Sequence, residues 1–196
     1  MNVLSLCSGV GMLDIGLKLA VPQSRTVCYV EREAFCAAVL VSRIKDKTLD
    51  DAPIWDDVTQ FPSNEWRGVV DCIIGGFPCQ PFSVSGTRGG VNDPRHLWPA
   101  ISEIVDIIKP EYCFWENVTG LLTTRTPDGR YAYEIVRDDL QAMGYRVEAG
   151  IFSAEEVGAP HRRERIFILA HSQRAGTRSE IRSTRGQVGS QDVRPR

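Results

Sequence analysis

Two hydrophobic patterns alternate along the 196-residue chain. Short apolar runs rich in β-branched residues predict buried strands, and apolar residues at helical spacing predict amphipathic helices. The predicted strands cover residues 2–6, 26–31, 54–58, 69–75, 112–115, 145–152 and 165–170. The predicted helices cover residues 12–20, 33–43, 97–108 and 133–143, the last two ended by Lys109-Pro110 and Gly144.

Strands that alternate with helices at these intervals predict an α/β fold with a doubly wound, mostly parallel sheet. The last two predicted strands have no helix between them, so we expect them to form an antiparallel pair. Ligands bind such sheets beyond the carboxyl ends of the strands. Four features lie at those ends, namely the glycine turn after the first strand, Glu31, Cys79 and Glu116.

Composition places the chain among ordinary globular proteins, with 42% hydrophobic and 24% charged residues. The net charge of −2 argues against a surface wholly devoted to nucleic acid but allows a local basic groove. The N-terminus lacks a cationic segment followed by a long apolar run, and no apolar stretch reaches membrane-spanning length. We therefore expect a cytoplasmic protein with no membrane partner.

The composition changes at Ser172, after which apolar residues are few and arginines frequent. A segment of this kind cannot bury enough apolar surface to fold. We expect one catalytic and cofactor-binding domain over residues 1–171 and a flexible basic tail over residues 172–196.

The cysteines do not form a metal-binding or disulfide pattern. None of the six belongs to a CxxC pair, and the three histidines are scattered, so we expect no metal. Four cysteines fall in predicted strands or helices and are expected to be buried and inert: Cys28, Cys36, Cys72 and Cys113. Cys79 lies outside any such run.

The segment SLCSGVGM, residues 5–12, follows the first predicted strand. Gly9 and Gly11 would let a ligand approach the main chain, although a lone G-x-G pattern is also typical of a plain strand-to-helix turn. Glu31 ends the second predicted strand, where a carboxylate can accept hydrogen bonds from ribose hydroxyls. Together these residues indicate a nucleoside cofactor.

Two further segments bring reactive groups to the same edge of the sheet. GGFPCQPFSVSG, residues 75–86, presents Cys79 in a loop, and FWENV, residues 114–118, delivers Glu116 at a strand end. A reactive cysteine needs surroundings that lower its pKa, and a carboxyl beside apolar neighbours can act as a general acid. Taken singly, each residue is also compatible with a structural or solvated role.

The fourth segment is HRRERIFILA, residues 161–170. In an extended chain Arg163 and Arg165 project to the same side and offer two guanidinium groups to a phosphate or a base carbonyl. The alternative is a pair of basic residues that keeps a strand soluble.

These four signals match one family in content and order. Over most of residues 2–170 the chain resembles the DNA cytosine-5 methyltransferases, which transfer a methyl group from S-adenosylmethionine to carbon 5 of cytosine. The segments GGFPCQPFSVSG, ENV and RRERIFIL carry the resemblance. It implies a Rossmann-like methyltransferase fold that acts on double-stranded DNA with a flipped cytosine.

The resemblance also implies roles for the residues. Cys79 would add to carbon 6 of the cytosine, and Glu116 would hydrogen-bond or protonate ring nitrogen 3. Arg163 and Arg165 would hold the base and its phosphate. The residues implied to line the S-adenosylmethionine site are Cys7, Gly9, Gly11, Glu31, Arg32, Asp57, Val58, Pro78 and Leu97. Residues 83–93 correspond to the mobile catalytic loop of the family.

Several positions depart from the family pattern. Cys7 stands where an aromatic residue is usual, Met12 where a glycine is usual, and His161 where a glutamine is usual. After residue 170 the family continues into a target-recognition domain and a final helix, and we expect neither within residues 171–196.

Three interpretations therefore stay open. The chain is an active methyltransferase, alone or with a complementary chain that carries target recognition; or a noncatalytic remnant that binds cofactor or DNA; or an RNA cytosine-5 methyltransferase.

Overall fold

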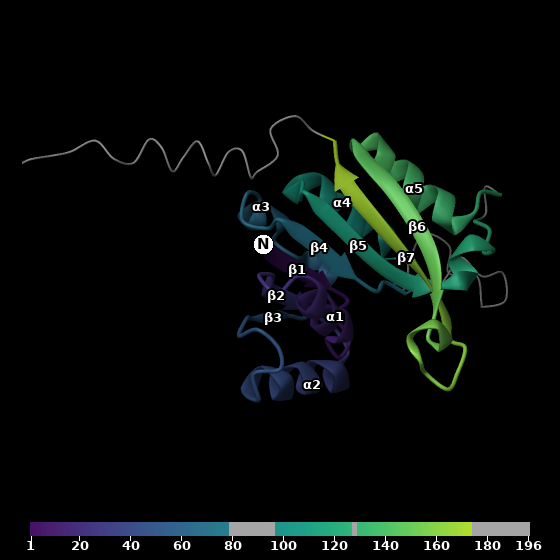
Figure 1. Cartoon of the computed structure of the whole chain (residues 1–196). Coiled ribbons are helices and arrows are strands. Elements are labelled where there is room, and N and C mark those ends of the chain that lie inside the picture. Colours follow the sequence, from purple (N-terminus) through teal and green to yellow (C-terminus); the bar gives the residue numbers. More distant parts are fainter. Residues whose placement is uncertain (79–96, 127–128, 174–196) are drawn as a thin grey trace, which may run out of the picture.

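The structure is a computed structural model that describes residues 1–78, 97–126 and 129–173. Within these ranges a single sheet has the strand order β3-β2-β1-β4-β5-β7-β6 (Figure 1). Its strands are β1 (Asn2–Leu6), β2 (Arg25–Val30), β3 (Ile54–Trp55), β4 (Cys72–Gly75), β5 (Tyr112–Val118), β6 (Tyr145–Ser153) and β7 (Glu164–Ser172). The α-helices are α1 (Met12–Ala20), α2 (Ala34–Lys45), α3 (Ser63–Trp66), α4 (Trp98–Ile108) and α5 (Ala132–Ala142). Short 3-10 turns are η1 (Val58–Gln60), η3 (Thr119–Leu122) and η4 (Glu155–Val157).

The strand directions confirm the predicted doubly wound fold. Strands β1 to β5 pair in parallel, whereas β7 lies antiparallel to both β5 and β6. The expected antiparallel pair at the end of the chain is therefore present. In Figure 1, α4 and α5 lie beside β4 to β7, while α1 and α2 lie toward the end of the sheet formed by β1, β2 and β3.

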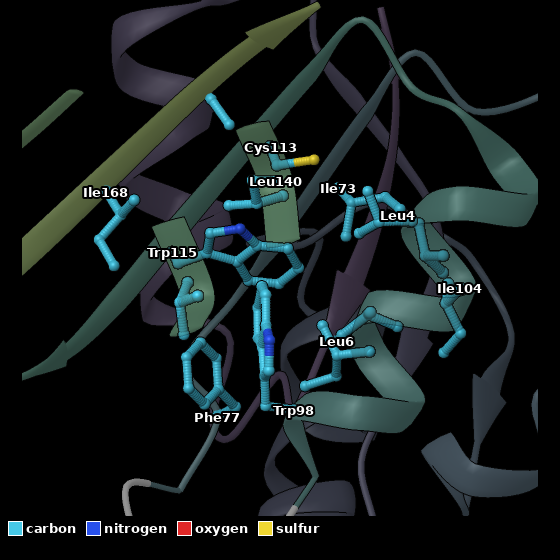
Figure 2. Packing of buried hydrophobic residues seen from close by; sticks show 14 of the residues in the cluster. Leu4, Leu6, Ile73, Phe77, Trp98, Ile104, Cys113, Trp115, Leu140 and Ile168 are labelled. Atoms are coloured by element: carbon cyan, nitrogen blue, oxygen red, sulfur yellow. The ribbon is translucent and has the colours of Figure 1, made fainter. Parts of the chain in front are cut away.

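The core lies on both faces of the sheet because neighbouring strand residues point to opposite sides. Leu4, Leu6 and Ile73 pack in the main cluster with the buried side of α4, as Figure 2 shows. Val3, Cys72 and Ile74 form a second cluster against Leu13 and Leu17 of α1. The apolar residues whose spacing predicted α4 are thus buried: Ile101, Ile104, Val105 and Ile108.

Asp14 is a buried carboxyl on α1 that joins this helix to two strands. Its two oxygens accept hydrogen bonds from the hydroxyls of Ser5 on β1 at 2.9 Å and Thr26 on β2 at 3.0 Å. Burial raises its pKa to about 6, although the two hydroxyl hydrogen bonds act in the opposite direction. The first turn of α1 is therefore held in place by a polar cluster.

Four strands differ by three residues in length from their predictions: β3 and β4 are shorter, and β5 and β7 are longer. The predicted strand 54–58 is a strand only at Ile54–Trp55, because the Asp57 carboxylate accepts hydrogen bonds from the backbone N–H and the hydroxyl of Thr59 and caps η1. The strand predicted over 112–115 continues to Val118, because β7 pairs with it as far as the Val118–Arg165 position.

The cysteines in strands are buried as expected: Cys28, Cys72 and Cys113. Cys36 on α2 is only half-buried, so burial was wrong for this one position. Among the described residues, no group of three or more His, Cys, Asp or Glu side chains is arranged to hold a metal ion. Within the same ranges no helix has the length and apolar character needed to cross a bilayer.

Candidate functional site

A pocket of about 530 Å³ opens at the carboxyl ends of β1 to β4. This volume lies within the range of roughly 300–1,000 Å³ that is usual for small-molecule sites. Its lining contains most of the residues that the family resemblance assigned to S-adenosylmethionine: Cys7, Gly9, Glu31, Arg32, Asp57, Val58, Pro78 and Leu97. The remaining lining residues were not predicted; Val30, Glu33 and Asp56 each adjoin a predicted one, and Gly76 lies two positions before Pro78.

Gly11 lies outside the lining of this pocket. Its φ of 79° is in the left-handed region, where it precedes the first residue of α1. A Cβ atom at this position would come within 2.6 Å of Leu49 Cδ1. The structure thus gives Gly11 a role in the turn and in packing, while Gly9 lies at the pocket.

The Glu31 carboxylate is held at the pocket by main-chain donors on either side. Its Oε2 accepts a hydrogen bond from the N–H of Gly9 at 2.6 Å, and its Oε1 accepts one from the N–H of Glu33 at 2.7 Å. The carboxylate therefore links the turn after β1 to the chain that leads into α2. Each carboxylate oxygen has a second lone pair, which can accept a further hydrogen bond from a ligand.

Cys7 follows β1 with a φ of 50°, which is uncommon for a residue other than glycine. Burial and the nearby negative charge of Glu31 raise the pKa of its thiol to about 12. The thiol is therefore neutral at physiological pH, and a neutral thiol is a poor nucleophile.

Carboxylates dominate the charge of the pocket. Among the described residues, Glu31, Glu33, Asp56 and Asp57 line it together with one cation, Arg32. Hydrogen bonds from Thr59 and the charge of Arg32 lower the pKa of Asp57, which keeps its carboxyl ionised. This lining favours a ligand with positive charge and hydroxyl donors. The sulfonium, ammonium and ribose groups of S-adenosylmethionine fit it.

Glu116 lies beside the pocket on β5. Its Oε1 is 2.8 Å from the Nε of Arg165 on β7, which is the adjacent strand. Its Oε2 would be 3.2 Å from a Cβ atom at Gly76, so this carboxylate approaches the main chain that lines the pocket. The structure therefore brings together two of the predicted catalytic residues, Glu116 and Arg165.

Asn117 is a site residue that the sequence reasoning missed. It is buried, and its Nδ2 donates a hydrogen bond to the carbonyl of Phe77 at 2.8 Å, while its Oδ1 accepts one from the N–H of Val118. Strand β5 thus carries Glu116. The next residue on this strand, Asn117, fixes the chain that follows β4. The signal for it was present in the ENV segment, where a polar residue follows the carboxylate.

The other two predicted catalytic residues are placed differently. Arg163 has a φ of 24° and precedes β7, which begins at Glu164, so the extended-chain argument does not hold for it. Cys79 lies outside the described residues, as does the predicted catalytic loop at 83–93; Pro78 is the last described residue before them.

The chain matches the family of C-5 cytosine-specific DNA methylases over residues 1–191. The chain belongs to this family. The resemblance drawn from the motifs is therefore confirmed.

Two curated relatives of this chain are type II methyltransferases. This chain is 35% identical over 173 residues to the type II methyltransferase M.AplI of Arthrospira platensis. The match covers 86% of this chain and 45% of that protein. This chain is 32% identical over 170 residues to M.NaeI of Lentzea aerocolonigenes, which covers 87% of this chain and 40% of that protein. The chain thus spans less than half the length of these relatives.

The fold of this chain recurs in solved structures. The S. pombe Dnmt2 methyltransferase has a TM-score of 0.72 and 24% identity, covering 90% of this chain and 52% of that one. A Spodoptera frugiperda DNMT2 variant has a TM-score of 0.72 and 22% identity, covering 89% of this chain and 51% of that one. These likenesses confirm the predicted methyltransferase-type α/β fold.

Proposed function

We propose that this chain forms the cofactor-binding and catalytic part of a DNA cytosine-5 methyltransferase that uses S-adenosylmethionine. One observation carries the proposal: Gly76 lines the pocket and also adjoins the Glu116 carboxylate, so a donor site and an acid lie next to each other. When bound, S-adenosylmethionine supplies an electrophilic methyl group.

In the proposed reaction, Cys79 attacks the base. Its thiolate forms a bond to carbon 6 of cytosine, and electron density moves to carbon 5 while Glu116 hydrogen-bonds or protonates ring nitrogen 3. Carbon 5 would then take the methyl group as its bond to sulfur breaks, with S-adenosylhomocysteine as the leaving group. Loss of the carbon 5 proton then restores the double bond and expels Cys79 as thiolate. The target base must first leave the helix stack, because stacked bases cannot contact these side chains.

Arg165 supports Glu116 in this proposal. Its guanidinium at 2.8 Å orients the carboxylate on the edge of the sheet and leaves further N–H donors for the base or its phosphate. Arg163 is proposed to contact the phosphate from its position just before β7.

The substrate of the whole protein is proposed as double-stranded DNA. Because the chain spans 45% and 40% of two type II relatives, we propose that target recognition resides in polypeptide equivalent to their unmatched parts, either continuous with this chain or in a complementary one.

A covalent trapping experiment tests the proposal. The probe is a pool of DNA duplexes with 5-fluorocytosine in random sequence context, because fluorine at carbon 5 cannot leave as a cation and the adduct persists. We expect an S-adenosylmethionine-dependent adduct on Cys79, and Cys79→Ala should abolish it. The reaction is run with the chain alone and with the unmatched part of the Arthrospira platensis relative.

The outcomes separate the candidate functions. Absence of an adduct in both settings, with cofactor binding retained, would leave a noncatalytic cofactor-binding protein. If neither the adduct nor cofactor binding is detected, the proposal is overturned. An adduct with RNA that contains 5-fluorocytosine, but not with DNA, would overturn the assignment of DNA as the substrate. The proposed methyl transfer to cytosine would still stand.

A further inference from the structure

Trp98 is a buried side chain with one directed polar contact. It is the first residue of α4 and is 2% exposed. Its indole Nε1 donates a hydrogen bond to Oδ2 of Asp139 on α5 at 2.8 Å. A hydrogen bond to a carboxylate is stronger and more directional than a neutral one, so it selects one orientation of the indole ring.

The Trp98 ring packs into a cluster of three aromatic side chains (Figure 2). The ring centroids of Trp98 and Phe77 are 5.2 Å apart, and each lies 6.0 Å from that of Trp115. Among the described residues, Trp115 Nε1 is buried without a hydrogen-bond partner. Trp98, by contrast, is oriented by its polar contact with Asp139, and its ring lies against that of Phe77.

The same two aromatic residues adjoin two residues of the pocket wall. Phe77 precedes Pro78, and Trp98 follows Leu97; both Pro78 and Leu97 line the pocket. These two residues belong to the β4 end of the pocket, whereas Asp57 belongs to the β3 end. The Trp98–Phe77 contact therefore joins the two chain segments that carry Pro78 and Leu97.

We propose that Asp139, which does not line the pocket, is a positioning residue for the part of the cofactor that lies at the β4 end. Through Trp98 and Phe77 it holds Leu97 and Pro78 at the spacing that accepts the methionine portion of S-adenosylmethionine. The adenosine portion, which would be held by Glu31 and Asp57 at the other end, does not depend on it. This inference rests on the proposed function for the identity of the cofactor.

The test compares two ligands on matched variants. Dissociation constants for S-adenosylhomocysteine and for adenosine are measured by calorimetry on the wild-type chain, Asp139→Ala, Asp139→Asn and Trp98→Phe. Asp138→Ala is the matched control, because Asp138 is the neighbouring carboxylate on α5 and pairs with Arg137 at 2.8 Å. Urea unfolding of each variant shows that the measurements refer to folded protein.

For Asp139→Ala and Trp98→Phe we expect S-adenosylhomocysteine to bind about tenfold more weakly, with adenosine affinity within about twofold of wild type. Asp139→Asn keeps an acceptor oxygen and should recover most of the loss, and Asp138→Ala should bind both ligands as wild type does. General destabilisation would weaken both ligands alike, so the selective loss identifies positioning.

Two results would overturn the inference. One is unchanged S-adenosylhomocysteine affinity in Asp139→Ala; the other is an equal loss for both ligands. Either can occur while the wild-type chain still binds both ligands, so the proposed function would stand. If the wild-type chain binds neither ligand, the proposed function fails, and the inference fails with it.

Discussion

Glu116 and Arg165 lie 2.8 Å apart on adjacent strands, and both are about one-third exposed or less. The antiparallel register places Arg165 opposite Val118, from where its side chain reaches back to the carboxylate. An ion pair with this exposure adds little to stability, typically about 0–1 kcal/mol. Its value is therefore in the orientation of the carboxylate.

Arg165→Ala should separate activity from stability. We expect formation of the 5-fluorocytosine adduct to slow by roughly a hundredfold, because one positioned charged donor is lost from the site. The free energy of unfolding should change by less than about 1 kcal/mol. Arg162→Ala removes the neighbouring exposed arginine, which pairs with Glu164, and should leave the adduct rate close to wild type. An equal effect of both substitutions would contradict a specific role for Arg165.

Asn117→Ala should destabilise the fold. The substitution leaves the Phe77 carbonyl without its 2.8 Å hydrogen bond, and an unpaired buried acceptor costs about 1–3 kcal/mol. Urea unfolding measures the loss. Asn64→Ala, an exposed change on α3, is the control and should have little effect. If Asn117→Ala were as stable as wild type, the amide contact would not matter for the fold.

Glu31→Ala should weaken S-adenosylmethionine binding by about tenfold or more, because the variant loses a charged acceptor at the pocket. It also releases the Gly9 and Glu33 N–H groups that the carboxylate now binds. Calorimetry measures the dissociation constant, with the exposed Glu65 on α3 substituted by alanine as the control. Unchanged affinity in Glu31→Ala would place the cofactor elsewhere.

Cys7 should resist alkylation at neutral and mildly alkaline pH. Its pKa is raised from 9.0 to about 12, so the thiol gives almost no thiolate at pH 8. Iodoacetamide followed by peptide mass spectrometry should leave Cys7 unmodified at pH 8 and modify it in urea, where burial is removed. Because the folded-state pKa is the higher one, this thiol favours folding below pH 9, and that contribution is lost as the pH rises toward 12. Rapid labelling of Cys7 in the folded protein at pH 8 would contradict this.

Asp14 should make stability depend on pH between about 4 and 6. Its folded-state pKa of about 6 exceeds the ordinary value of 3.8, so the protonated form is the one that the fold favours. Its contribution is complete below pH 3.8 and is lost as the pH rises through 6, by at most about 3 kcal/mol. Asp14→Asn lacks this titration. From pH 4 to pH 7 the free energy of unfolding of wild type should fall relative to that of Asp14→Asn. Parallel pH profiles of the two proteins would show that Asp14 does not titrate in this range.

Hydrophobic spacing was enough to predict the order of the strands and of the four longer helices, because the same residues that set the spacing are buried, but it did not predict the short helix α3. It failed where polar groups decide the conformation. The strand β5 was predicted too short because Glu116 and Asn117 are polar, yet pairing with β7 keeps both in the sheet. The Asp57 side chain ends β3 by capping η1, a local contact that apolar patterning does not register.

The pocket was predicted from a family resemblance more fully than from chemistry alone. Strand ends indicated Gly9 and Glu31, but Leu97 and Pro78 have no polar group to mark them in the sequence. The two glycines of the first turn look alike in sequence, and only the packing of Leu49 against Gly11 distinguishes them. The Trp98–Asp139 contact joins two helices, so no local pattern predicts it.

Gly76 determines how closely the pocket proposed for the methyl donor approaches the proposed acid, Glu116. It is part of the pocket lining, and on its other side is the Glu116 carboxylate. If Glu116 holds the base as proposed, the reacting carbon would lie close to the pocket proposed for the donor, and the methyl group would need no tunnel or carrier to reach it.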